Sequence, residues 1–199
     1  MQRGKNSMMF KKVMGLAMVV ALTACGGGSK SKGEEKTKEE FDQAAVERTD
    51  VAGSGYNTAT VKGTHLQRYN GQDAKIDYEA KYARDGDTWN VTEDNVPSSL
   101  ATLLKDINFT MAYYSTFAAV FERTFSKDFQ MKYYLADDYA TLEIAGESTS
   151  GNMVGTVVGE FEWNKFGLLT RWHEKDNFSN YMGYQGVVIE ETMNFTYAA

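Results

Sequence analysis

The chain has 199 residues, with 21 Lys and Arg against 27 Asp and Glu, and a formal net charge of −6. This acidic balance argues against general nucleic-acid binding, which needs a basic surface to displace phosphate counterions. One Cys excludes an internal disulfide framework and a Cys-rich zinc site, and two His argue against a histidine metal centre. The sequence therefore predicts neither a cofactor nor a metal site.

The N-terminal residues have the pattern of a secretory signal peptide. Residues 1–12 are polar and basic, and residues 13–24 (VMGLAMVVALTA) form an uncharged apolar run. No apolar run reaches the length of about 20 residues that a membrane-spanning helix needs. We therefore expect a leader over residues 1–24 that is cleaved between Ala24 and Cys25.

Residues 22–25, Leu-Thr-Ala-Cys, resemble the bacterial lipobox, in which a Leu and two small residues precede a Cys. The resemblance implies a diacylglyceryl thioether on Cys25, the single Cys of the chain. Each buried methylene contributes about 0.8 kcal/mol, so two or three acyl chains would anchor the protein firmly. We expect a lipid-anchored protein of the cell membrane that faces outside the cytoplasm. The alternative is an ordinary secretory signal with an incidental Cys.

A flexible tether is expected after the lipidated Cys. Residues 26–40 (GGGSKSKGEEKTKEE) contain no aromatic or large apolar side chain, so burial cannot offset their ordering entropy. Residues 41–48 suggest one or two amphipathic helical turns. We therefore place the lipidated Cys and tether over residues 25–45, and a single folded domain over residues 46–199.

In the first half of the domain, a two-residue alternation of apolar and polar side chains predicts antiparallel strands. Residues 58–69 and 74–84 follow this pattern, and residues 89–91 continue a short partner strand. Asn70-Gly71 and Asp85-Gly86 predict the hairpin turns between them, because Gly tolerates positive φ.

The second half repeats this pattern and brings the total to about eight strands. Strands are expected over residues 130–136, 139–145, 152–163, 168–173 and 186–198. In the last of these, Glu191 interrupts a face that is otherwise apolar. The interruption marks a sheet end, a bulge or the wet mouth of a cavity. The side chains that share this face are Val187, Ile189, Met193, Phe195 and Tyr197.

Residues 97–125 differ, because their apolar side chains recur at steps of three and four, which predicts a helical insertion. Pro97 suits a first helical turn. Residues 106–108 offer a break into two helices, and the aromatic and Thr content of residues 109–117 leaves a strand as the alternative. The apolar side chains proposed to contact a ligand from this insertion are Leu100, Leu104, Ile107, Met111 and Phe121.

Strands, a helical layer and further strands predict an α+β fold, in which a twisted antiparallel sheet curls around the insertion. With the anchor, this order resembles the LolA-like and LppX-like half-barrel lipoprotein carriers. The hairpin sequence of residues 161–172 (FEWNKFGLLTRW) and the Gly-rich tether look like those of Gram-positive lipoproteins, while a Gram-negative envelope stays open. The resemblance implies a curved half-barrel with the helices on one face and an apolar cavity that holds acyl chains.

No constellation of catalytic residues is found, so the sequence predicts a non-enzymatic binding role. There is no G-x-S-x-G motif, and His65 and His173 fall in strand-like segments. Glu160 and Glu162 alternate with apolar side chains, which indicates a solvated sheet face. We expect a membrane contact through the anchor and a lipid or other apolar ligand between sheet and helices. The alternative is an acidic, Tyr-rich interaction module that contacts an envelope protein or a cell-wall polymer.

Overall fold

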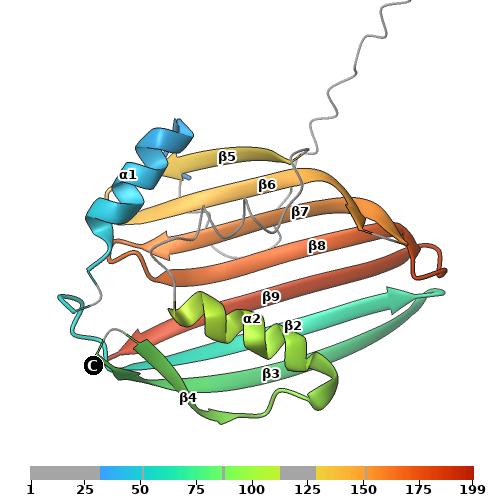
Figure 1. Cartoon of the computed structure of the whole chain (residues 1–199), viewed down its shortest axis with the longest axis horizontal. Helices are drawn as coiled ribbons and strands as arrows, with labels where there is room; N and C mark the ends of the chain where they lie inside the picture. Colours follow the sequence, from blue (N-terminus) through green and yellow to red (C-terminus); the bar gives the residue numbers. More distant parts are fainter. Residues whose placement is uncertain (1–31, 51, 87, 113–128, 151) are drawn as a thin grey trace, which may run out of the picture. The chain divides into compact units, whose positions relative to one another are not determined.

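The described residues form one open antiparallel sheet of nine strands, in the order β1-β5-β6-β7-β8-β9-β2-β3-β4 (Figure 1). The computed structural model describes residues 32–50, 52–86, 88–112, 129–150 and 152–199. The strands are β1 (Glu34–Lys36), β2 (Thr58–Tyr69), β3 (Gln72–Asp85), β4 (Thr88–Asp94), β5 (Gln130–Leu135), β6 (Tyr139–Ser150), β7 (Met153–Asn164), β8 (Leu169–Tyr181) and β9 (Val187–Ala198). The helices are α1 (Lys38–Arg48), the short 3-10 helix η1 (Ser98–Leu100) and α2 (Ala101–Ala112).

Two runs of sequential hairpins meet where the last strand pairs with β2. Strands β2 to β4 form one run and β5 to β9 the other, and β9 lies antiparallel to β2. The β2–β3 turn has φ of 51° at Asn70 and 73° at Gly71, the left-handed pair that a tight hairpin requires. The predicted antiparallel sheet and this turn are confirmed.

One face of the sheet, which we call the inner face, carries the core, and α2 lies across it (Figure 1). Ile107 and Met111 of α2 are 0% and 2% exposed and belong to this core. The Tyr82 hydroxyl donates a hydrogen bond of 2.8 Å to Asn108 Oδ1 and ties α2 to β3. The predicted packing of a helical insertion on one face is confirmed for α2. No helix among the described residues is long and apolar enough to cross a membrane.

The ninth strand lies within the segment predicted as tether. Glu34–Lys36 pairs with β5, so part of the segment predicted as tether over residues 25–45 forms a strand, and the compact unit of the described residues begins at Lys32. These residues are all polar and show no apolar alternation. Backbone pairing to an edge strand positions them, and composition carries no signal for such pairing.

Helix α1 is longer than the one or two turns expected. Thr37 and Glu40 form a reciprocal capping box that fixes its start. Phe41 is 2% exposed, and its ring packs against those of Tyr133 and Trp163 at centroid distances of 5.2 and 5.9 Å. A single aromatic side chain therefore docks α1 on the core.

The structure differs from the sequence-based prediction in two further elements. Strand β8 continues to Tyr181, well beyond the predicted residues 168–173. The second half of β8 places acidic side chains on the inner face, so the sequence there lacks the alternation of apolar and polar residues that predicts a half-buried strand. Residues 109–112 of the alternative strand are helical, while residues 113–125 of the predicted insertion lie outside the described residues.

Candidate functional site

A cavity of about 380 Å³ lies between the start of the helical segment and the inner face of the sheet. Strands β2, β8 and β9 form its floor, and η1 with the first turn of α2 forms its roof. Its volume lies within the range of roughly 300–1,000 Å³ that is usual for small-molecule sites. The roof residues are Ser99, Leu100, Thr102 and Leu103, and the floor residues are His65, Trp172, Glu174, Asp176, Ile189 and Glu191.

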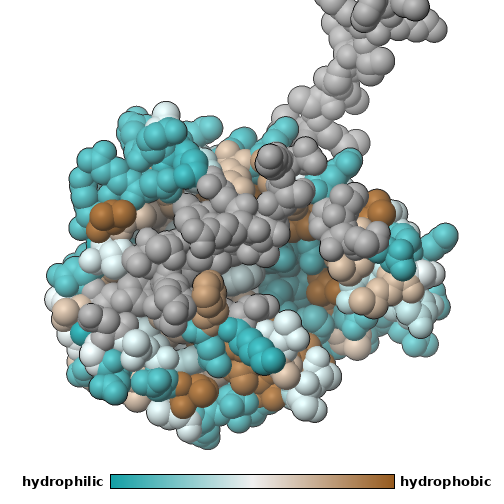
Figure 2. Space-filling view, in the orientation of Figure 1, coloured by the Kyte–Doolittle hydropathy of each residue, from teal (hydrophilic) through white to brown (hydrophobic). Residues whose placement is uncertain are grey.

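One part of the lining is apolar. Leu100 and Leu103 come from the roof and Trp172 and Ile189 from the floor. The Trp172 ring meets Phe161 edge-on at a centroid distance of 5.2 Å, and Phe161 is fully buried. On the face that carries α2, hydrophobic and hydrophilic side chains lie next to each other (Figure 2).

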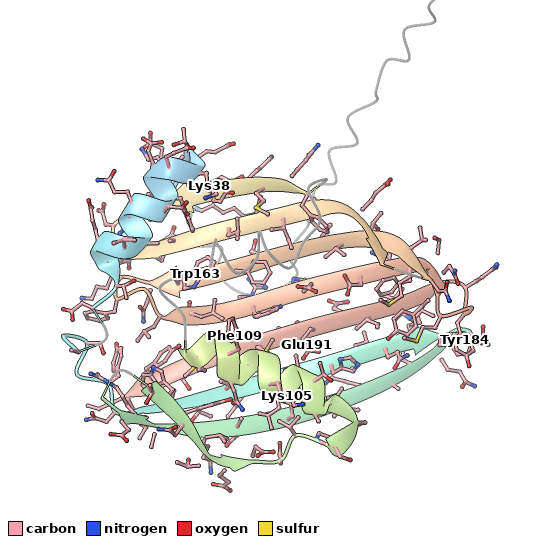
Figure 3. The ribbon with its side chains drawn as sticks, viewed as in Figure 1. Lys38, Lys105, Phe109, Trp163, Tyr184 and Glu191 are labelled. Carbon is pink, nitrogen blue, oxygen red and sulfur yellow. The ribbon has the colours of Figure 1, made fainter. Side chains whose placement is uncertain are left out.

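The polar side chains of the floor are mostly acidic, and the strand register brings them together. Glu174 of β8 lies opposite Glu191 of β9, and Glu191 lies opposite His65 of β2. Asp176 follows Glu174 at the next inward position, because side chains two apart in a strand share a face. Figure 3 shows Glu191 on β9 beneath α2. Three carboxyl groups and one imidazole therefore share one wall.

Glu191 is held by a chain of buried hydrogen bonds. It is 8% exposed, and it accepts a hydrogen bond of 2.5 Å from the Tyr78 hydroxyl at Oε1, while Oε2 lies 2.7 Å from His65 Nδ1. Burial raises the pKa of Glu191, and the bonds to Tyr78 and His65 partly offset that rise. Burial, and next the charge of Glu191, raise the pKa of Tyr78 far above its usual value. Tyr78 therefore stays protonated and donates.

A glycine makes the Tyr78 contact possible. Tyr78 lies on β3 and Glu191 on β9, and β2 runs between these strands. A Cβ added at Gly63 of β2 would lie 2.1 Å from Tyr78 Cζ and 2.2 Å from its hydroxyl oxygen. The Tyr78 side chain thus crosses β2 over the backbone of Gly63, where any larger residue would obstruct it.

Asp176 differs from Glu191 because one of its carboxyl oxygens accepts no hydrogen bond from the described residues. Its Oδ1 is buried, and within the described ranges it has no hydrogen-bond partner. Burial raises the pKa of Asp176 from 3.8 to about 6. The group is still mostly ionised at neutral pH, so it places an uncompensated negative charge against the cavity.

The structure brings together only part of the predicted ligand-contacting set. Leu100 lines the cavity, whereas Leu104 packs against the core, and Ile107 and Met111 are buried within it. Phe121 lies outside the described residues, as do the predicted cleavage and lipidation residues, Ala24 and Cys25.

Sequence reasoning missed most of the floor of the cavity. Trp172, Glu174 and Asp176 are spaced by two, so continuing the strand pattern past residue 173 would have found the acidic pair. Glu191 was singled out by its interruption of an apolar face, and of the three alternatives it is the cavity position that the structure shows.

The other acidic pair considered lies on the opposite face. Glu160 and Glu162 both accept hydrogen bonds from Arg171 Nη1, at 2.8 and 3.3 Å, and His173 Nε2 lies 3.0 Å from Glu190. These partly exposed contacts lie on the sheet face opposite to the buried side chains of β7. Within the described part of the chain, no group of three or more His, Cys, Asp and Glu side chains is placed to hold a metal ion.

Comparison with known proteins adds little to this geometry. Scanned against protein-family models, the chain matches none, and a search of curated proteins finds no match. Among solved structures it is similar to a LolA superfamily protein from Nitrosomonas europaea, with 12% identity and a TM-score of 0.26. The match covers 81% of this chain and 92% of that one. A likeness at this TM-score carries no functional argument.

Proposed function

We propose that this protein is a membrane-anchored bacterial lipoprotein that binds a small amphipathic molecule in the cavity under η1 and α2, without catalysis. The observation that carries the proposal is a cavity whose lining is divided into an apolar and a polar part. An apolar ligand segment would pack on Leu100, Leu103 and Trp172, while a polar group would meet the carboxyl groups. Ligand sites are commonly built this way, from apolar walls with a few placed polar groups.

The anchoring part of the proposal rests on the sequence. Residues 13–24 are an apolar run of signal-peptide length, and Cys25 follows a Leu and two small residues. A lipidated Cys25 would hold the protein at the outer side of the cell membrane. Residues 26–31 would then separate the anchor from the folded unit that begins at Lys32.

Native mass spectrometry tests the binding role. The protein form is residues 26–199, which keeps β1 and α1, purified from bacterial extract without detergent. We expect a bound mass of a small molecule that is lost on denaturation. Leu100→Trp, which fills the cavity from its roof, should reduce that mass. Val91→Trp, on an exposed position of β4, is the control and should retain it.

A protein free of bound mass that still melts cooperatively would contradict the binding role. It would favour the second candidate, an interaction module, which one surface feature supports. Tyr69 and Tyr184 are 36% and 54% exposed, and their rings meet edge-on at a centroid distance of 5.0 Å. Figure 3 shows Tyr184 at one end of the sheet. Cross-linking in cells that is lost in Tyr69→Ser/Tyr184→Ser would support this candidate.

A further inference from the structure

We propose that the ligand of this cavity carries a positively charged amine, which Asp176 binds directly while the apolar part of the ligand packs against Trp172 and the roof. This inference rests on the proposed binding function and names the chemical class of the ligand. It departs from the acyl-chain carriers that the sequence resembles, because it requires a cationic headgroup.

The charge of the lining is the first observation. Three of the ten lining residues are carboxylic acids, and no Lys or Arg of the described chain lines the cavity. A carboxylate or phosphate on the ligand would meet like charge in a partly desolvated site, which costs binding free energy. A neutral ligand would leave the acidic wall unused. A cation is the one ligand charge that this wall attracts.

Hydrogen bonding then distinguishes Asp176 from Glu191. Both oxygens of Glu191 are engaged, by Tyr78 and by His65. The Asp176 side chain lines the cavity and makes no hydrogen bond or ion pair within the described residues, and its Oδ1 is a buried acceptor without a donor. A buried acceptor that lacks a donor costs free energy, and a ligand ammonium supplies both the donor and the opposite charge. Asp176 is therefore the residue assigned to the amine.

The neighbouring aromatic residue fits the same ligand. Trp172 lies two residues before Glu174 on the inner face and lines the cavity with it. The Trp172 indole ring offers a large apolar surface on which an alkyl chain can pack. Ile189 lies opposite Asp176 in the β8–β9 pairing and supplies an apolar surface next to the charge. One end of the cavity thus suits a cation and the adjoining wall suits a hydrocarbon.

Size limits the ligand further. At about 30 Å³ for each water-sized group, a cavity of about 380 Å³ holds about a dozen non-hydrogen atoms. A single alkyl chain with one amine meets this limit, whereas a lipid with two long acyl chains exceeds it. Decylamine is therefore a suitable probe, with decanol and decanoate as neutral and anionic probes of the same chain length.

The test is isothermal titration of residues 26–199 with the three probes at neutral pH, below their micelle concentrations. We expect decylamine to bind about tenfold or more tightly than decanol, and decanoate to bind most weakly. Asp176→Asn keeps the shape of the side chain and removes its charge. It should abolish the preference for decylamine and leave decanol binding unchanged or improved. Glu190→Gln removes the same charge from the outer face of β9 and is the matched control.

Lowering the pH gives a second readout. Protonation of Asp176 near pH 6 should weaken decylamine binding and leave decanol binding nearly constant. Among the described residues, the other titratable groups that line the cavity with Asp176 are Glu174 on its own strand, Glu191 on β9 and His65 on β2, while Ser99 and Thr102 of the roof carry no charge. Protonation of any of these three groups acts in the same direction, so Asp176→Asn must reduce the pH dependence for the assignment to hold.

The outcomes separate the inference from the proposed function. Equal affinity for all three probes, or a preference for decanoate, would overturn the inference and leave a binding cavity. An unchanged preference in Asp176→Asn would overturn the assignment to that residue. Binding of none of the probes overturns the inference, and the native mass spectrum then shows whether the binding function falls with it.

Discussion

Gly63→Ala tests the arrangement that positions Glu191. An added Cβ would lie 2.1 Å from Tyr78 Cζ, whereas ordinary contacts begin at 3.4 Å, so the ring must move by roughly 1.3 Å or more. Such a shift breaks the 2.5 Å hydrogen bond to Glu191. Overpacking typically costs about 1–3 kcal/mol, and losing a hydrogen bond to a charged group about 1.5–3 kcal/mol. We expect the free energy of unfolding to fall by about 3–5 kcal/mol.

Urea unfolding followed by Trp fluorescence measures this loss, and a double-mutant cycle shows its origin. Tyr78→Leu removes Cζ and the hydroxyl, the atoms nearest to the added Cβ. In that background Gly63→Ala should be neutral or slightly stabilising, because Ala restricts the unfolded chain more than Gly does. A loss below about 1 kcal/mol in the native background would refute the reasoning, as would an equal loss in both backgrounds.

Three further changes have defined outcomes. Asp176→Asn should raise the free energy of unfolding at neutral pH by about 1–2 kcal/mol, because a pKa raised to about 6 means that the folded state disfavours the ionised carboxylate, and partial exposure reduces this penalty. Thermal melts should show this gain in stability fading as the pH falls from 6 towards 4. A gain that grows over the same range would contradict the prediction. Phe41→Ala should cost about 3 kcal/mol by releasing α1 from the core, and a loss within about 0.5 kcal/mol in urea titrations would show that α1 is not docked by this ring. Cys25→Ser should move the protein from the membrane fraction to the soluble envelope fraction or the medium, and retention in the membrane would argue against a lipid anchor.

The sheet was largely predictable because its strands bury one face only. Strand β2 runs over the predicted residues 58–69, and the Asn70-Gly71 turn has the predicted backbone geometry. Alternation with a period of two survives in a single sequence wherever apolar side chains face the core and polar ones face water. For the same reason β9 was found, together with the unusual position of Glu191.

The sequence did not predict the elements whose position does not depend on apolar side chains packing on one face. Strand β1 is three polar residues that pair through their backbone, and no side-chain pattern marks them. In the second half of β8, Glu174 and Asp176 face the cavity. In the sequence, this acidic wall has the same pattern as a segment exposed to solvent. Helical periodicity alone does not distinguish side chains of a filled core from those that line a cavity, so the predicted ligand-contacting set mixes the two. Among the described members of that set, Ile107 and Met111 fill the core, and only Leu100, which lies in η1, lines the cavity.

The most direct test of the account is an NMR titration that follows the indole Nε1–H signals of the three Trp residues. Trp172 lines the cavity, whereas Trp89 and Trp163 belong to the core, and Trp172→Phe assigns the signals. On addition of decylamine to residues 26–199, the Trp172 signal should shift saturably while those of Trp89 and Trp163 stay nearly fixed. A saturated complex in which Trp172 does not shift, or in which Trp89 shifts most, would contradict binding in this cavity.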